Sequence, residues 1–156
     1  MSFYILANQV TFLLLSLNLM TTLSFDSEII SYMYGGSKEE IYFKVTNKNK
    51  TLAIKPLMKS DYSNLLVITK SNKYYFNLKY SETKPHQFIE VFDGVKSHNL
   101  SKKLHTTDYE ILEGKSSVLI INKKSEPLFV NSKEINRKEY FSKGVPIFIN
   151  NERVLN

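Results

Sequence analysis

The chain contains no cysteine and no tryptophan among its 156 residues. The absence of cysteine excludes a disulfide scaffold, a thiol nucleophile and a thiolate metal site. Arginine is also scarce, with 2 residues against 19 lysines. Proteins that read nucleic-acid sequence usually cluster arginines, because the guanidinium fork matches phosphate and guanine edges. These absences favour a binding or structural module over an enzyme or a specific nucleic-acid reader.

The formal net charge of +6 comes mainly from the middle of the chain. Residues 38–84 hold ten lysines against four acids, whereas residues 25–37 carry −2 and residues 85–156 carry +2. The lysines of the middle segment are spread along the chain, which is typical of a solvated surface. The hydrophobic share of 42% is that of a globular domain, so wholesale disorder is not expected.

The first charged side chain is that of Asp26. Before it, residues 10–20 (VTFLLLSLNLM) form a short apolar core with the length of a signal-peptide core, and small residues precede a cut before Phe25. We therefore predict a signal peptide over residues 1–24 and export of the chain. No lysine or arginine precedes the core, which departs from the signal pattern. Two alternatives stay open: an uncleaved membrane anchor, since about 20 residues span a bilayer, and a buried element of the fold.

Alternation of hydrophobic and polar residues dominates from residue 28 onward and is typical of half-buried strands. It predicts a β-hairpin over residues 65–80, with a two-residue turn at Ser71 and Asn72 and with Phe76 on the core face. Several short strands separated by turns argue for a sandwich or barrel. We predict an all-β fold with an immunoglobulin-like β-sandwich over residues 25–95. Further strands are expected at Ile30–Tyr34, Ile41–Thr46, Leu52–Ile54, Phe88–Phe92 and Val118–Asn122.

Residues 96–156 are predicted to form a loop and β-hairpin extension, with a polar loop over residues 96–107. Residues 127–135 recur at residues 146–154 with an offset of 19. Each copy places a polar pair, headed by Asn131 or Asn150, between β-prone arms, which predicts two small hairpins. The alternative is a helix capped by Asn131 that runs through Ser142.

No pattern in the chain predicts a catalytic, cofactor-binding or metal-binding residue. The Gly114-Lys115-Ser116 segment lacks the earlier glycine of a phosphate-binding loop and is followed by β-branched residues where a helix is needed. Asp108, Glu110 and Glu113 indicate a solvated turn, with Thr107 as its cap. The three histidines have no metal-ligand spacing and are predicted to lie on the surface. They are His86, His98 and His105.

Two other chemistries were weighed and rejected. A Ser-His-Asp triad assembles in space, so counting does not exclude one, but the chain has no Gly-x-Ser-x-Gly elbow. The segment Lys70–Phe76 (KSNKYYF) mixes bases and aromatics as single-strand nucleic-acid binders do. The alternation sends Tyr74 and Phe76 to the core face, so we expect them to serve packing.

Three consecutive segments resemble the N-terminal domain of the TrbG/CagX conjugal-transfer family, the ninth VirB protein of type IV secretion systems. They read TLAIKP over residues 51–56, DYSNLLVIT over residues 61–69 and YYFNL over residues 74–78. Residues 89–92 lie where the closing strand of the family domain falls. Tyr62 is an insertion relative to the family pattern, and Phe43 stands where the family has a tryptophan. The usual second β-domain has no counterpart here.

The resemblance implies a non-catalytic structural subunit of the periplasmic part of a type IV secretion core complex in a Gram-negative bacterium. The implied partners are an inner-membrane-anchored channel subunit, ring paralogues, further copies of the chain in a ring and an outer-membrane lipoprotein. No specific nucleic acid, no small-molecule substrate and no cofactor is expected. The alternative is an unrelated periplasmic β-sandwich that binds a peptide or a glycan.

Overall fold

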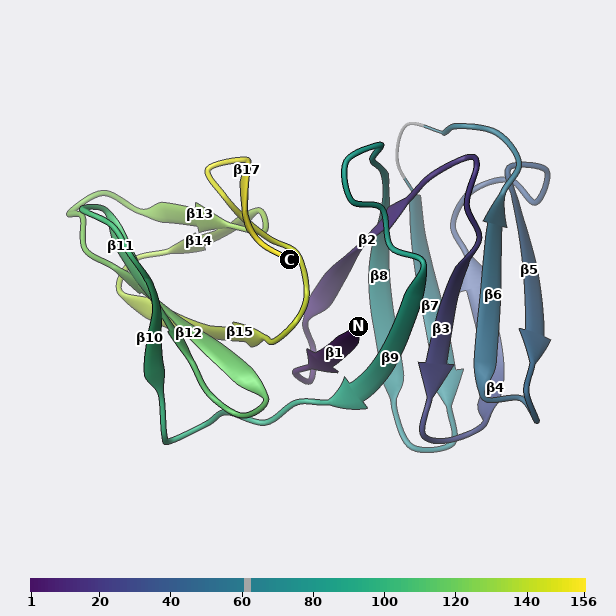
Figure 1. The fold of residues 1–156 in the computed structure, drawn as a ribbon, viewed down its shortest axis with the longest axis horizontal. Helices are drawn as coiled ribbons and strands as arrows, with labels where there is room; N and C mark the ends of the chain where they lie inside the picture. Colours follow the sequence, from purple (N-terminus) through teal and green to yellow (C-terminus); the bar gives the residue numbers. More distant parts are fainter. Residues whose placement is uncertain (61–62) are drawn as a thin grey trace. The chain divides into compact units, whose positions relative to one another are not determined.

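The computed structural model describes residues 1–60 and 63–156, and these residues form 17 β-strands and no helix. The prediction of an all-β, sandwich-type fold is confirmed. The chain divides into two compact units, each shown in Figure 1. The first comprises Met1–Ser2 and Val10–Phe92, and the second comprises Phe3–Gln9 and Asp93–Asn156.

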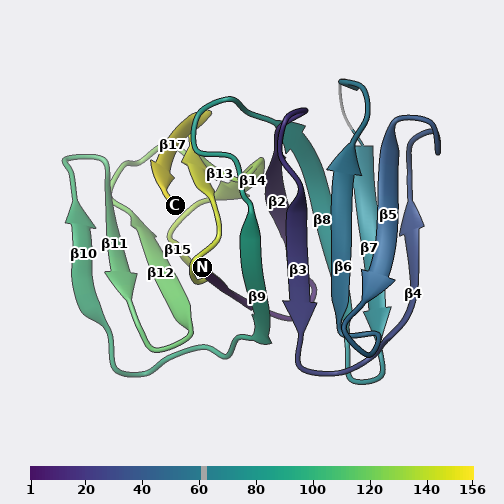
Figure 2. The ribbon, with the colours of Figure 1, turned by 45° about the vertical axis from the view of Figure 1, so that its right-hand side comes forward.

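Two sheets build the first unit, and Figure 2 shows their strands running roughly alongside one another. One sheet contains the order β9-β3-β6-β5 and the other is β2-β8-β7-β4. Most neighbours are antiparallel, but β2 runs parallel to β8 and β3 runs parallel to β9. The strands are β2 (Val10–Leu15), β3 (Thr21–Phe25), β4 (Ile29–Tyr34), β5 (Ile41–Thr46), β6 (Thr51–Pro56), β7 (Ser63–Thr69), β8 (Lys73–Tyr80) and β9 (Phe88–Asp93).

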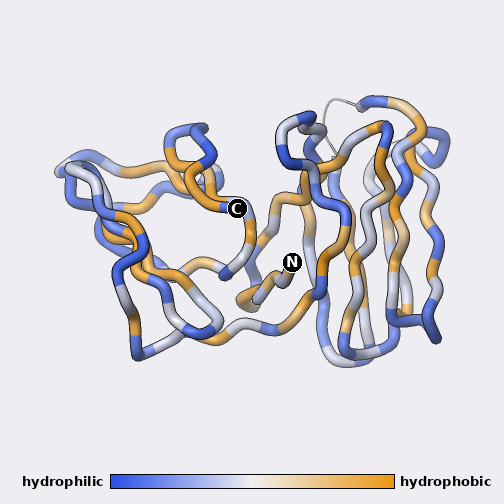
Figure 3. The backbone as a smooth tube through the Cα atoms, in the orientation of Figure 1, coloured by the Kyte–Doolittle hydropathy of each residue, from blue (hydrophilic) through white to orange (hydrophobic). Residues whose placement is uncertain are grey.

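The predicted hairpin is confirmed as β7 and β8, with Leu65 paired to Phe76. Its alternation is visible in the exposures, since Phe76 is fully buried and its neighbour Tyr75 is 43% exposed. Figure 3 shows the same alternation of hydrophobic and hydrophilic residues along the strands of this unit. The turn lies one residue earlier than predicted, because Thr69 donates to the carbonyl of Asn72 (2.9 Å) and encloses Lys70 and Ser71.

Strand β4 departs from simple alternation at Ile30. The pairing of β4 with β7 shifts register between Ile29 and Ser31, as a β-bulge does. The bulge buries Ile29 and leaves Ile30 65% exposed. The prediction that Ile30 shares the face of Tyr32 and Tyr34 is therefore wrong, because the bulge inserts one extra residue into the alternation.

The N-terminal segment is built into the fold as strands. Residues 2–25 form β1 (Ser2–Ile5), β2 and β3, and β3 lies between β6 and β9. Leu13, Leu14 and Leu15 are buried. This arrangement is the buried-element alternative, whereas cleavage before Phe25 stays a prediction that would remove β1, β2 and most of β3. Among the described residues there is no helix that could cross a membrane.

The segments that carry the family resemblance occupy neighbouring strands of the first unit. Residues 51–56 are β6, the described part of residues 61–69 is β7, and residues 74–78 lie within β8. Asp61 and Tyr62 lie outside the described residues. Phe43 on β5 packs its ring against Tyr32 and Tyr34, with centroids 5.2 and 5.4 Å away.

The second unit holds two four-stranded sheets, where the sequence predicted a loop and hairpins. Its sheets are β10-β11-β12-β15 and β14-β13-β16-β17. The expected loop over residues 96–107 is wrong in part, because Ser101–His105 pairs with Tyr109–Glu113 despite its polar sequence. The strands are β10 (Ser101–His105), β11 (Tyr109–Glu113), β12 (Ser117–Asn122), β13 (Leu128–Val130), β14 (Lys133–Ile135), β15 (Lys138–Ser142), β16 (Ile147–Ile149) and β17 (Glu152–Leu155).

The repeat forms two hairpins, as predicted, and the helix alternative is wrong. β13 pairs with β14 and β16 with β17, each across two residues of positive φ, which a type I′ turn requires. The hairpins also bond each other reciprocally. The amide of Asn131 donates to the Phe148 carbonyl and that of Asn150 donates to the Phe129 carbonyl, both at 2.9 Å. An offset of 19 exchanges the two pairs, so the repeat packs with local two-fold pseudosymmetry.

Candidate functional site

The histidines do not assemble into a site. His98 and His105 are exposed, as predicted, but His86 is 1% exposed, so the surface prediction is wrong for it. Its backbone amide donates to the Leu14 carbonyl (2.7 Å), and its Nδ1 accepts from the Leu14 amide (3.0 Å). His86 thus bonds a backbone donor and acceptor of strand β2, a structural use of the imidazole that spacing in sequence does not show.

The acidic residues of the second unit are paired with lysines. Glu113 bonds Lys143 (3.0 Å) and Lys103 (3.3 Å), and Glu110 lies 3.8 Å from Lys102. The hydrogen bond from Lys143 lowers the pKa of the Glu113 carboxyl below its ordinary value, with Lys103 adding to the effect. No group of three or more histidine, aspartate or glutamate side chains that could hold a metal occurs in the described part of the chain.

The turns of the second unit have no catalytic geometry. Thr106, and not the predicted Thr107, caps the turn before β11, because its Oγ1 accepts from the amides of Asp108 (3.2 Å) and Tyr109 (3.0 Å). Gly114 donates to the Ser117 carbonyl (2.9 Å) in a tight turn that leads into strand β12. Because a strand and not a helix follows, this turn offers no helix N-terminus for a phosphate.

Aromatic residues of the segment Lys70–Phe76 are used for packing. Tyr74 is 5% exposed and its ring centroid lies 5.1 Å from that of Phe25. Phe76 is fully buried, which leaves Tyr75 as the one ring of the segment on the surface. A stacking surface for single-stranded nucleic acid needs successive exposed rings, and this segment does not offer one.

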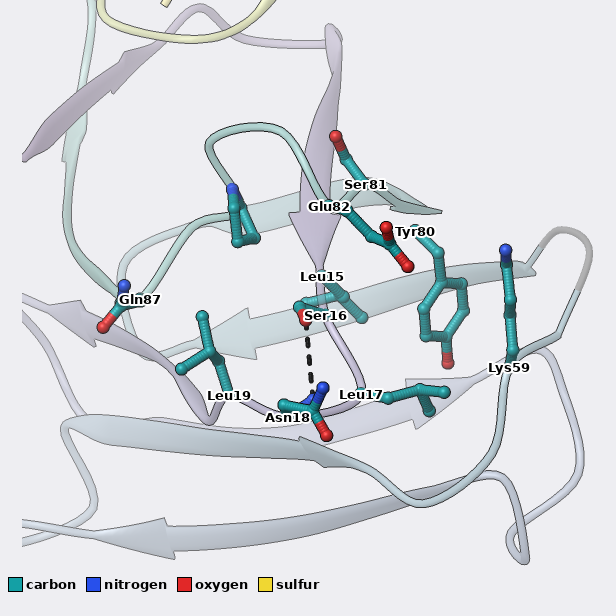
Figure 4. Close-up of a pocket in the computed structure, with 11 residues that line it drawn as sticks. Leu15, Ser16, Leu17, Asn18, Leu19, Lys59, Tyr80, Ser81, Glu82 and Gln87 are labelled. Carbon is teal, nitrogen blue, oxygen red and sulfur yellow. Dashed lines mark hydrogen bonds between the residues drawn. The ribbon is translucent and has the colours of Figure 1, made fainter.

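A pocket of about 620 Å³ in the first unit is the best candidate for a binding site. Three loops meet around it: Ser16–Leu19 after β2, the segment with Lys59 after β6, and residues 81–87 after β8. Figure 4 shows Lys59 and Tyr80 on one side and Leu19 and Gln87 on the other. The lining residues are Leu15, Ser16, Leu17, Asn18, Leu19, Lys59, Tyr80, Ser81, Glu82, Pro85 and Gln87.

The chemistry of the pocket is polar and close to neutral. Lys59 and Glu82 are the charged side chains of the lining, one of each sign. The Tyr80 hydroxyl donates to the Met58 carbonyl (3.1 Å), and burial raises the pKa of this hydroxyl above its ordinary value. Pockets of this size with apolar walls and a few polar groups hold small ligands or short chain segments. The lining has no histidine or cysteine to act as base or nucleophile.

Sequence reasoning missed this pocket for two reasons. Its residues come from three loops that are far apart in sequence, and Leu15–Leu19 was interpreted as the core of a signal peptide. A run of leucine, serine and asparagine has no spacing that indicates a binding loop.

Comparison with known proteins yields no relative. No family model matches the chain, and no curated protein matches it.

Proposed function

We propose that the chain is a non-catalytic structural subunit of the periplasmic part of a type IV secretion core complex. The observation that carries the proposal is the resemblance of residues 51–56, 61–69 and 74–78 to the TrbG/CagX N-terminal domain. The matching segments fall on β6, β7 and β8, which are consecutive strands of one unit. A resemblance in strand sequence and order is the kind expected when the shared property is a fold used for assembly.

The physical requirements of such a subunit are modest. A ring subunit needs no active site, only complementary surfaces that repeat by rotation and close. The net charge of +6 would orient the chain against acidic neighbours and would accelerate encounter more than it would raise affinity. The partners in this proposal are the inner-membrane-anchored channel subunit, ring paralogues, other copies of the chain and an outer-membrane lipoprotein. The location is the periplasm of a Gram-negative cell.

Affinity purification from native membranes tests this proposal. A tagged chain expressed from its own locus should co-purify with the channel subunit and ring paralogues after mild detergent extraction. A matched control carries Phe76→Ala, which disturbs the core of the first unit and should lose these partners. Recovery of the intact chain without any secretion-channel subunit would refute the proposal.

The pocket favours a second candidate function, a binding module for a peptide or a glycan. Its lining offers amides, hydroxyls and one charge of each sign, which suits a polar ligand of low net charge. Titration of the labelled chain with a neutral tetrapeptide or with a chitin tetrasaccharide would test it by NMR. Shifts confined to Ser16–Leu19 and residues 81–87 would support this function, and the absence of shifts with both probes would count against it.

A further inference from the structure

Strand β4 presents a free edge that lacks the charges found on other edges. Edge strands invite pairing with another chain, and proteins block them with charged residues or with a covering segment. No charged residue occurs between Ile29 and Ser37. Among the sheets of the described chain, the other terminal strands with unpaired sides carry charges: Lys44 on β5, Lys102 and Lys103 on β10, Lys133 on β14, Lys138 on β15 and Arg153 on β17.

The opposite edge of the same sheet is covered by the chain itself. Both backbone groups of Leu14 on β2 are bonded by His86. Strand β4 has no such cover, and Met33 on it is 66% exposed. Figure 2 shows β4 at the end of its sheet, next to β5. The sheet is therefore closed at β2 and open at β4.

The pairing of β4 with β7 fixes which backbone groups are free. Gly35 donates to the Asn64 carbonyl (2.9 Å), and Met33 is paired with Leu66 in the same ladder. Because the backbone groups of an antiparallel strand point alternately to either side, those of Tyr32 and Tyr34 point away from β7. The bulge at Ile30 ends the regular ladder on the other side. The free, regular part of the edge is short and is centred on Met33.

We propose that two copies of the chain pair through β4, antiparallel and two-fold symmetric about Met33. In this register Tyr32 of each copy bonds Tyr34 of the other. Met33 faces Met33 as a non-hydrogen-bonded pair, in which the side chains lie closest. The pairing uses only the regular part of the edge and leaves the bulge outside it.

The charges that flank β4 fit a second copy. Glu28 and Lys38 lie five residues before and after Met33. Antiparallel pairing about Met33 therefore directs Glu28 of each copy toward Lys38 of the other. Glu28 already bonds Lys70 in its own chain (2.9 Å), but its side chain is still 44% exposed and can accept a further bond. A two-fold contact closes a dimer, and this inference does not depend on the proposed function.

The absence of cysteine makes the test direct. Facing residues of a non-hydrogen-bonded pair have Cα atoms about 4.5 Å apart, which is within the range of a disulfide. The purified full chain with Met33→Cys should form a disulfide-linked dimer under mild oxidation. Met20→Cys is the matched control, because Met20 is 55% exposed on a loop of the same unit and should stay monomeric under the same conditions.

A second variant tests the same contact without chemistry. Met33→Lys places two ammonium groups opposite each other, so the dissociation constant measured by sedimentation should rise by at least about tenfold. Circular dichroism should show the native fold, because Met33 is exposed. Equal cross-linking of the Met33→Cys and Met20→Cys chains would overturn the proposal. So would a wild-type chain that is monomeric at all concentrations, or a dimer that Met33→Lys leaves intact.

Discussion

Removal of residues 1–24 is the perturbation that best separates the two interpretations of the N-terminus. The truncated chain would begin at Phe25 and would lack β1, β2 and most of β3. Leu13, Leu14, Leu15 and Leu23 would be lost, and each is at most 1% exposed. Burial of one leucine side chain is worth about 1.5–3 kcal/mol. The four together amount to on the order of 6–12 kcal/mol, which is comparable to the whole stability of a domain, about 5–15 kcal/mol.

The truncated chain should therefore fail to fold. Strand β8 would lose its parallel neighbour, and β6 and β9 would each lose the strand between them. The measurement is urea unfolding followed by circular dichroism, with the full chain as control. We expect a cooperative transition for residues 1–156 and none for residues 25–156. A cooperative transition of similar midpoint in the truncated chain would refute the reasoning and would restore residues 1–24 as a removable signal.

Three further predictions concern single residues. Phe76→Ala should lower the free energy of unfolding by about 3–5 kcal/mol, whereas Tyr75→Ala should cost much less; equal losses in urea unfolding would mean that the register of β8 is wrong. His86→Ala should cost about 2–3 kcal/mol because the amide of Leu14 loses its acceptor and a cavity opens, and His98→Ala, at an exposed site, should change stability by less than about 0.5 kcal/mol. Glu113 has a lowered pKa in the folded state, so its contribution is present above its unfolded value near 4.5 and is lost as the pH falls through the folded value; Glu113→Gln should remove about 1 kcal/mol of this acid dependence, and an unchanged stability profile below pH 5 would contradict it.

The elements that sequence predicted correctly are those whose period is carried by large side chains. Strands β5 to β9 alternate aromatic or aliphatic residues with polar ones, and the alternation persists in their burial. The repeat with Asn131 and Asn150 was also predicted, because asparagine at the turn accepts a positive φ that few other residues adopt at low cost. In both cases the information is local.

The elements that were missed depend on pairing between distant segments. Strand β10 reads SKKLH and has no apolar face, so it forms only because β11 supplies a partner. Strand β2 was interpreted as a signal core because a run of leucines buried on both faces has no alternation. Its neighbour β8 lies more than 60 residues away. The pocket was missed for the same reason, since three loops far apart in sequence form it.

The two proposals place different demands on the surface of the first unit. A two-fold contact through β4 closes a dimer and uses up the open edge, so a ring must be built from other surfaces. The loops after β2 and β6 offer one, because they carry Leu17, Met20, Leu57 and Met58, each between 43% and 55% exposed. Apolar side chains gathered on loops are unusual without a partner. A chain that uses these loops for assembly and β4 for pairing could therefore join two neighbouring subunits without either contact blocking the other.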